Sequence, residues 1–517
     1  MFKLFKKSSK EKEQIIEEKV NQWNAPLEEK QVCASLDDNI SISHQLFSGM
    51  DIIQYRQVES GGKTPLRCFL VFCEGSVDAE IINSNIIRPL MCHVPDDIRV
   101  SPETLLQRVI QVGETKTAGC YKDVVEGVMC GNTVLFAEGC DQAFVLNTKH
   151  FVVRAISEPD NEKVLVGPRE GFTECLIQNI SQIIRRLHTN DLKTKRLVLG
   201  KRTKTSVYVC YFDSLADKGI VQNILQMLDN IDIDGVLDSN YITELIRDKR
   251  WSAFRTTGYT ERPDTVVGKL LEGRIAIFVD GSPMVLTIPY LFIENFQSSE
   301  DYYLSYYYTS FARILRFCAF LLTITIPSFY IAIVAFHQEM MPLELLIRIA
   351  LERQKVPLPA ALEAVVMLLV FDILRETGIR MPSNIGQALS IVGALVIGQA
   401  AVEASLVAAP MIIIVAATGI TGLLVPKLNA PILLWRFFFL FLTSLFGFFG
   451  FTIAFSVIII HITNLTSFGV EQVTIEGGFH FQHVKDIFIR APWPFMIERP
   501  REITKNRTRQ SRGDGNG

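Results

Sequence analysis

The chain has 517 residues, which is too long for one hydrophobic core, so we expect two or three domains. Its 55 acidic and 52 basic residues nearly cancel, which excludes the basic excess that nucleic-acid binding requires. The 48% of hydrophobic residues are distributed unevenly. Charges occur every few residues before about Asp301, whereas the chain from Ile314 to about His461 is mostly apolar.

The apolar region contains stretches that approach the roughly 20 residues with which a helix crosses a bilayer. The clearest are Ile314–Phe336 and Ile432–Ile460. Soluble proteins rarely contain helices that are apolar on all sides over such lengths. We therefore predict a polytopic α-helical membrane domain at residues 301–470. Because no apolar signal segment follows the charged start Met1–Lys12, we expect the preceding head to stay in the cytosol.

The head begins with a charged leader at residues 1–30. Leu66–Cys73 is a short apolar run typical of a buried strand, and Val77–Met91 has apolar residues at helical spacing. Thr133–Ala137 and Ala143–Leu146 flank a Glu-Gly turn and predict a hairpin.

A second group of elements follows. It comprises the predicted helix Gly171–Leu187, strand Ser206–Phe212, helix Ile220–Leu228 and the hairpin of Arg274–Val279 with Met284–Ile288. The alternation of strands and helices predicts an α/β head of two subdomains, at residues 31–160 and 161–300. Whether the two are internal repeats stays open at this point.

The junction between head and membrane domain carries interface-type residues. Tyr306, Tyr307 and Tyr308 precede Arg313 and Arg316. Tyrosines are enriched at membrane–water interfaces and arginines on the cytoplasmic side, so we predict that all five anchor the chain at the membrane surface. An aromatic patch within a protein core is the alternative.

The later apolar segments differ from one another. Pro342–Lys355 is amphipathic and is expected to lie along the interface. Leu389–Ala409 and Met411–Val425 are short and separated by Pro410, which predicts a broken or hairpin pair. The tail, residues 471–517, is basic and favours a cytosolic C-terminus, so the number of spans is even. Four fits most simply and six is compatible.

Polar residues within apolar segments are the candidate functional residues. Gln399 and Glu403 are four apart on one helix face, beside small residues that allow close helix approach. A carboxylate at such depth is costly unless it faces partner helices or water. Helix packing and an ion path are both open interpretations.

Three further acidic residues lie in the segment that starts at Pro359. They are Glu363, Asp372 and Glu376, and we treat them as candidates for a pore or a subunit interface. Arg375 and Arg380 are close to the last two, so structural ion pairing is the alternative.

Motifs of catalysis and cofactor binding are weak or missing. Gly62-Lys63-Thr64 lacks the rest of a phosphate-binding loop, and Asn230–Tyr241 lacks the final glutamate of a calcium loop. His480 and His483 are the only closely spaced histidines, and no C-x-x-C, H-E-x-x-H or G-x-S-x-G occurs. We expect no enzyme activity, no metal and no cofactor.

Several longer stretches together form a specific sequence pattern, namely Gly167–Glu174, Tyr259–Asp264, Leu271–Gly281, Pro327–Tyr330, His337–Met340, Gly386–Ala404, Leu465–Val470 and Ile489–Pro492. In these stretches the chain resembles the A subunits of GerA-type spore germinant receptors. Family members usually continue with a proline after the position of Val470, where this chain has Glu471, so the geometry of that last loop stays open.

The resemblance implies a multi-pass protein of the spore inner membrane, with its head on the spore-core side. It implies that the chain works with a transporter-like B subunit, which binds the nutrient, and a lipoprotein C subunit. It further implies a ring-shaped homo-oligomer, with five copies expected, that forms a nutrient-gated cation channel and triggers germination. A secondary-transporter subunit and a structural scaffold for the receptor are the alternatives. Neither the nutrient nor the ion selectivity follows from the sequence, and a separate ligand for the head stays open.

Overall fold

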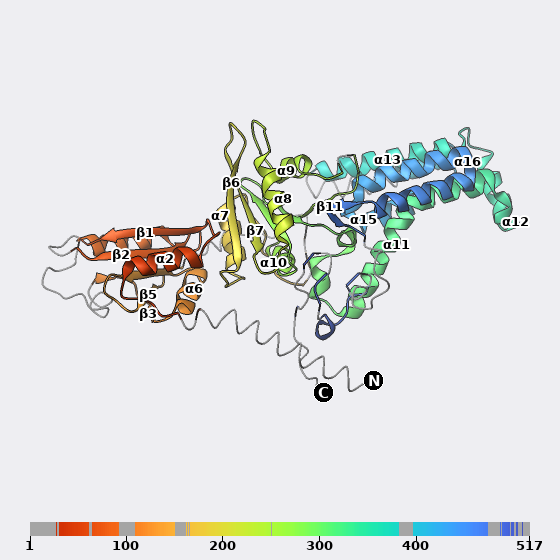
Figure 1. The fold of residues 1–517 in the computed structure, drawn as a ribbon. Coiled ribbons are helices and arrows are strands. Elements are labelled where there is room, and N and C mark those ends of the chain that lie inside the picture. The colour runs from red at the N-terminus through yellow and green to blue at the C-terminus, as the bar shows by residue number, and fades with distance from the viewer. Residues whose placement is uncertain are drawn as a thin grey trace, which may run out of the picture.

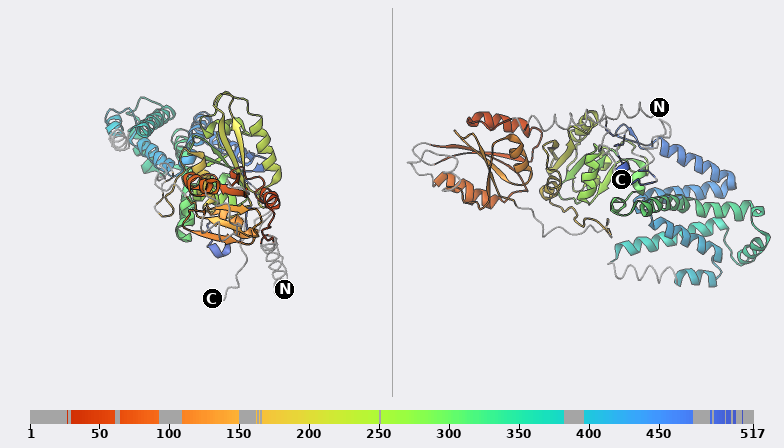
Figure 2. Two further views of the ribbon diagram at one scale, coloured as in Figure 1. Left: turned by 90° about the vertical axis from the view of Figure 1, so that its left-hand side faces the viewer. Right: turned by 90° about the horizontal axis from the view of Figure 1, so that it is seen from below.

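The computed structural model describes residues 27, 30–60, 65–92, 109–149, 162, 164, 166–249, 251–381, 396–473, 486–487, 489–496, 498–500, 503–504 and 509. The molecule is elongated, and its three parts follow one another in a row (Figures 1 and 2). Two subdomains, each built on a β-sheet, are followed by a helical part that projects away from them.

The first subdomain is a five-stranded antiparallel sheet with the order β1-β2-β4-β5-β3. Its elements are α2 (Leu36–Leu46), β1 (Ile53–Glu59), β2 (Arg67–Cys73), α3 (Ala79–Ile81), the π-helical turn η1 (Ile82–Ile87), α4 (Arg88–Cys92), β3 (Thr115–Ala118), α6 (Tyr121–Met129), β4 (Thr133–Ala137) and β5 (Ala143–Leu146). The strands β2 and β4 are almost wholly buried, as their continuous apolar sequences require.

The second subdomain has the same topology, with strands in the antiparallel order β6-β7-β9-β10-β8. Its elements are α7 (Leu176–Ile184), β6 (Leu192–Leu199), β7 (Thr205–Phe212), α8 (Lys218–Asp229), α9 (Ser239–Leu245), β8 (Gly258–Thr260), α10 (Pro263–Leu271), β9 (Ile275–Val279) and β10 (Val285–Ile288). In each subdomain, the strand that comes third along the chain therefore lies at the edge of the sheet and pairs with the strand that comes fifth.

Local hydrogen bonds are repeated as well. The Asn39 side chain bonds both backbone groups of Cys33, and the Asn179 side chain bonds the same two groups of Thr173. Gly139, in the hairpin turn of the first subdomain, donates its N–H to the carbonyl of Ala34 at 2.9 Å. Gly281, in the corresponding turn of the second subdomain, donates its N–H to the carbonyl of Glu174, also at 2.9 Å. Because topology and local bonds agree, the two subdomains are an internal structural repeat, which answers the question that the sequence left open.

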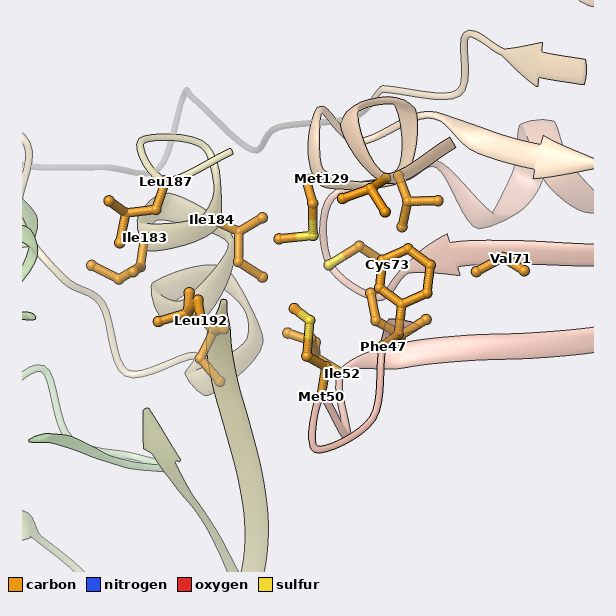
Figure 3. Packing of buried hydrophobic residues seen from close by; sticks show 14 of the residues in the cluster. Phe47, Met50, Ile52, Val71, Cys73, Met129, Ile183, Ile184, Leu187 and Leu192 are labelled. Atoms are coloured by element: carbon orange, nitrogen blue, oxygen red, sulfur yellow. The ribbon is translucent and has the colours of Figure 1, made fainter. Parts of the chain in front are cut away.

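The two subdomains share one hydrophobic core (Figure 3). Phe47, Met50, Ile52, Cys73 and Met129 of the first lie opposite side chains of the second, namely Ile183, Ile184, Leu187 and Leu192. The backbone joins them too, because Asp51 N–H donates to Thr194 O and Thr194 N–H donates to Gly49 O, both at 2.9 Å. A shared apolar core of this kind favours one rigid head.

The sequence predicted several of these elements correctly. Both hairpins, the strands Leu66–Cys73 and Ser206–Phe212, and the helix Ile220–Leu228 are confirmed within two residues. The helix expected at Gly171–Leu187 begins only at Leu176. The edge strands β1, β3, β6 and β8 and the helices α2, α6 and α10 were not predicted, because they are short or carry many polar residues.

The helical part begins with α11 (Tyr306–Ile331), which continues through a π-helical turn to Phe336. It then contains α12 (Leu343–Arg353), α13 (Ala360–Arg380), a helical stretch at residues 396–403, α15 (Ala409–Leu423) and α16 (Asn429–Thr463). Two helical segments among the described residues, Tyr306–Phe336 and Pro426–Thr463, are long and apolar enough to cross a membrane. The break predicted before α15 is present, since Ala404–Ala408 leaves the helix and Ser405 adopts a φ of 54°.

The long helix α16 is a hairpin of two antiparallel arms. Gly447 has φ 58° and ψ −136°, which is outside the helical region. Trp435 lies 5.4 Å from His461 and Phe439 lies 5.7 Å from Phe451, measured between ring centroids, so residues on either side of the glycine face each other. The apolar stretch Ile432–Ile460, which by length alone suits one spanning helix, is therefore divided into two helical arms. Hydropathy does not register a single glycine that reverses the chain direction.

We expect the turn of the α16 hairpin to be sensitive to substitution of Gly447. The φ of Gly447 is one that L-residues rarely adopt, and a Cβ there would lie 2.7 Å from Cγ of Phe336. We expect Gly447→Ala to lower the free energy of unfolding by roughly 1–3 kcal/mol, because an alanine is strained in such a conformation. Thermal unfolding in detergent measures this loss. Gly268→Ala is the matched control, because the helix α10 holds Gly268 and a Cβ there meets nothing within 4 Å; equal melting temperatures for the two variants would contradict the turn.

Candidate functional site

Gln399 and Glu403 lie together on the helical stretch 396–403. The Gln399 amide donates to Glu403 Oε1 at 2.9 Å, and both side chains are exposed. Gly398, on another side of this helix, is buried near Ile412 of α15. The shared polar face predicted from the four-residue spacing is thus present. Within the described part of the chain it is uncovered.

Glu363, unlike Gln399 and Glu403, lies inside the protein. It is buried at the start of α13, and its Oε1 accepts the N–H of Ala408, the N-cap residue of α15, at 2.6 Å. A carboxylate at a helix N-terminus satisfies a free N–H and interacts favourably with the helix dipole. Glu363 therefore stabilises the break before α15 from a neighbouring helix, and sequence spacing gave no sign of this contact.

Asp372 and Glu376 share a helix but not a role. Asp372 forms an ion pair with Arg436 of α16, and both side chains are largely buried. Glu376 is exposed and pairs with Arg380 one turn later at 2.7 Å. Ion pairing was one of the two sequence interpretations, but the partner expected for Asp372 was a neighbour on its own helix. The structure instead brings Arg436 from 64 residues away.

The residues predicted as membrane anchors fall into two groups. Tyr307 and Tyr308 are exposed at the start of α11, and Tyr306 is partly exposed. Arg313 is buried, and Arg316 is mostly so. The two arginines point into the protein, because carboxylates there bind both guanidinium groups.

These carboxylates join three parts of the chain. Asp301, in the segment that leads into α11, accepts from Arg313 at 2.9 Å and from Arg316 at 3.0 Å. Asp486, in the C-terminal tail, accepts from Arg313 at 2.8 Å and from the Tyr302 hydroxyl at 3.0 Å. Burial raises the pKa of Tyr302 well above its usual value, and the nearby Asp486 adds to this. The head, α11 and the tail are thus held by one buried charge network, named here the junction network.

A second buried network lies beside the first. Arg274, which directly precedes β9, forms ion pairs with Glu272 at 3.2 Å and with Glu294. Glu294 also pairs with Lys269, at 2.7 Å. Burial alone would raise the pKa of Glu294, but Arg274 and Lys269 outweigh it and hold the pKa below its usual value. The carboxylate therefore stays charged and fixes α10 to the segment that precedes α11.

A cavity of about 490 Å³ lies between these networks and the helical part. Its walls combine charged and aromatic side chains, among them Tyr259, Lys269, Tyr302, Arg316, Lys427 and Trp493. Lys427, in the loop between α15 and α16, lies 4.0 Å from Glu162 and 3.5 Å from the carbonyl of Gln297. The cavity therefore touches the head, α11 and the α15–α16 loop at once.

The aspartates of the candidate calcium loop form other contacts in the structure. In the candidate calcium loop, Asp232 pairs with Lys201 and Asp234 with Arg202, while Asp238 caps α9. Over the described ranges, no group of His, Cys, Asp and Glu has the arrangement of a metal site. Residues 62–64, His480 and His483 lie outside the described residues.

The pair of Asp372 and Arg436 predicts strong energetic coupling. Either Asp372→Asn or Arg436→Gln leaves a buried polar group without its partner and should cost ~3–5 kcal/mol of unfolding free energy. The double variant should cost less than the sum, by ~0.5–3 kcal/mol. Denaturant titration of the full chain in detergent micelles gives all three values. The exposed pair of Glu376 and Arg380 is the control, for which we expect at most ~0.5 kcal/mol; strictly additive losses at Asp372 and Arg436 would refute the coupling.

Residues 41–502 match a protein family described as "Bacillus/Clostridium GerA spore germination protein". The chain is 40% identical over 475 residues to "Uncharacterized membrane protein YfkQ" of Bacillus subtilis (92% of each chain). It is 38% identical to "Spore germination protein KA" of the same organism, covering 92% of this chain and 88% of that one.

Among solved structures, the N-terminal domain of the A subunit of the Bacillus megaterium spore germinant receptor GerK3 matches 51% of this chain and 98% of that chain, with 28% identity and a TM-score of 0.38. "Spore germination protein A1" of Bacillus subtilis is 31% identical over 471 residues, covering 90% of this chain and 95% of its own length. Because the family match spans nearly the whole chain and several relatives exceed 30% identity, the chain belongs to the GerA spore germination protein family.

Proposed function

We propose that this chain is the A subunit of a nutrient germinant receptor in the spore inner membrane, and that several copies form a cation channel whose opening starts germination. Family membership supports the receptor part of this proposal. In it, a transporter-like B subunit binds the nutrient and a lipoprotein C subunit completes the receptor. A ring of five copies is the assembly that we expect.

The observation that carries the channel part is the uncovered polar face of residues 396–403. Glu403 and Gln399 bond only each other among the described residues, and both are exposed. An ionised carboxylate that faced lipid would be very costly. The face therefore requires water or a neighbouring subunit, and a ring of such carboxylates attracts cations.

The fold also supports a path from the head to this face. The junction network fixes the start of α11 to the head and to the tail. Both ends of the α16 hairpin lie at the head, where its aromatic residues contact Phe254. Asp372 and Arg436 connect α16 to α13. Rigid elements linked in this way convert a rotation of the head into a shift of the helices, as gating requires.

The hairpin changes the number of spans that we propose. We count α11, α13, the apolar segment predicted from Leu389 that ends with the helical stretch 396–403, α15 and the two arms of α16, which makes six. Six is one of the two even numbers that the sequence allowed. It keeps the head and the tail on the same side, which the contact between Arg313 and Asp486 requires.

Neutralising Glu403 tests the channel. Glu403→Gln keeps the hydrogen-bonding shape and removes the charge, so we expect cation release from germinating spores to fall by roughly tenfold, the equivalent of ~1.4 kcal/mol of lost attraction. Conductance of the purified chain in planar bilayers should fall in parallel. Glu376→Gln is the matched control, because Glu376 is also exposed but is paired with Arg380. Unchanged cation release from Glu403→Gln spores with normal protein levels would exclude the residue from permeation.

The rival functions give different results in the same assays. The break at Ala404–Ala408, stabilised by Glu363, is the observation that favours a secondary transporter, since broken helices often hold transported solutes. A transporter subunit would give saturable uptake of a solute and no single-channel currents. A scaffold would lose receptor assembly, without any change in ion permeability, when Glu403 is replaced.

A further inference from the structure

Large aromatic and apolar side chains of α9 and of the loop that follows it are exposed, and no element among the described residues covers them. Trp251 is fully exposed, and Leu237, Tyr241 and Leu245 are 66%, 41% and 43% exposed. Tyr241 and Leu245 share one face of α9, and Leu237 immediately precedes its N-cap. We call these four residues the α9 patch. A cluster of large apolar side chains in contact with water usually marks a binding surface.

The α9 patch is fixed at the head end of the α16 hairpin. The hydroxyl of Ser252, next to Trp251, is hydrogen-bonded to Nε2 of His461 in the last turn of α16, at 2.9 Å. Phe254 packs on Trp435 and His461, with ring centroids 6.4 and 5.8 Å apart. The patch thus has a fixed position where the two arms of the hairpin meet the head.

The loop that carries Trp251 is held from within. The guanidinium of Arg247 points inward and donates to the carbonyls of Ser252 and Phe254. Asp248 accepts the N–H of Phe468, in the turn that follows α16. The arginine and the aspartate are therefore used to fix the loop, while Trp251 and Lys249 stay exposed.

We propose that the α9 patch docks on the lipid surface, at headgroup level, beside the point where the α16 hairpin enters the membrane. This proposal rests on the membrane insertion of α16 in the proposed function. Tryptophan and tyrosine are the side chains enriched at membrane interfaces, because one end of each is apolar and the other polar. Lys249 adds a cation that fits anionic headgroups.

The observations favour lipid over a second protein chain. The loop that carries Trp251 contacts the last turn of α16 through Ser252 and His461, and the patch combines aromatic residues with a lysine, as interfacial anchors do. At the head-side start of α11, Tyr307 and Tyr308 are exposed in the same way. Two separate elements therefore present exposed aromatic side chains where the helical part leaves the head.

Quenching of tryptophan fluorescence by brominated lipid tests the proposal. The full chain, with Trp23→Phe and Trp493→Phe throughout so that only Trp251 and Trp435 emit, is the reference that is called wild type here. It is placed in nanodiscs of phosphatidylcholine and phosphatidylglycerol with plain or brominated acyl chains. Bromine should quench wild type more strongly than Trp251→Phe, because the emission of Trp251 is lost in the variant. In Lys249→Glu the extra quenching should decrease with anionic lipid and persist in pure phosphatidylcholine.

The emission of Trp435 distinguishes a failure of the docking proposal from a failure of the proposed membrane insertion. It lies between the hairpin arms, so quenching of its emission in Trp251→Phe reports insertion of α16. If that emission is quenched but wild type shows no more quenching than the variant, the docking of the α9 patch is wrong and the membrane insertion stands. If bromine quenches neither protein, both the docking and the insertion are wrong.

A photoreactive benzophenone amino acid at position 251 identifies the occupant directly. We expect adducts with lipid in the same nanodiscs. Adducts that join two copies of the chain, without lipid adducts, would assign the α9 patch to a subunit contact and overturn the proposal.

Discussion

The buried ion pairs of Arg313 hold the three parts of this molecule together. The guanidinium joins Asp301, just before α11, to Asp486 in the C-terminal tail, and Arg316 adds a second contact to Asp301. Removing one partner of such a pair leaves an uncompensated charge in a site of low polarity, which is strongly unfavourable. The direction in which α11 leaves the head is therefore determined by charge pairing as well as by apolar packing.

The head that this network anchors is a stiff unit. The two repeats share a core through residues such as Phe47 and Leu187, and β6 reaches across to bond the backbone at Asp51. The second repeat is also attached to the end of α16 through Ser252 and His461. A stiff head attached to both α11 and α16 is suited to transmit a rotation, whereas a head with loosely connected subdomains would absorb it.

The polar residues of the helical part show which contacts a sequence pattern can predict and which it cannot. Spacing alone placed Gln399 and Glu403 on one face, because that relation lies within a single helix turn. It could not find the partners of Glu363 and Asp372, since Ala408 and Arg436 lie on other helices. Arg436 carried a signal that went unused, because a lone arginine in an apolar stretch requires a carboxylate partner. The buried Asp301 and Asp486 gave no comparable signal.

Composition and local order by themselves determined much of this protein. The apolar stretches, the hairpins with their glycine turns, the amphipathic α12 and the family resemblance all depend on short windows of sequence or on motifs read directly. The repeat relation of the subdomains, the reversal at Gly447 and the junction network were decided only by the tertiary structure. The reason is physical, since hydropathy and propensity describe a residue and its neighbours along the chain. A buried charge is instead stabilised by whichever group packing brings to it, often from more than forty residues away.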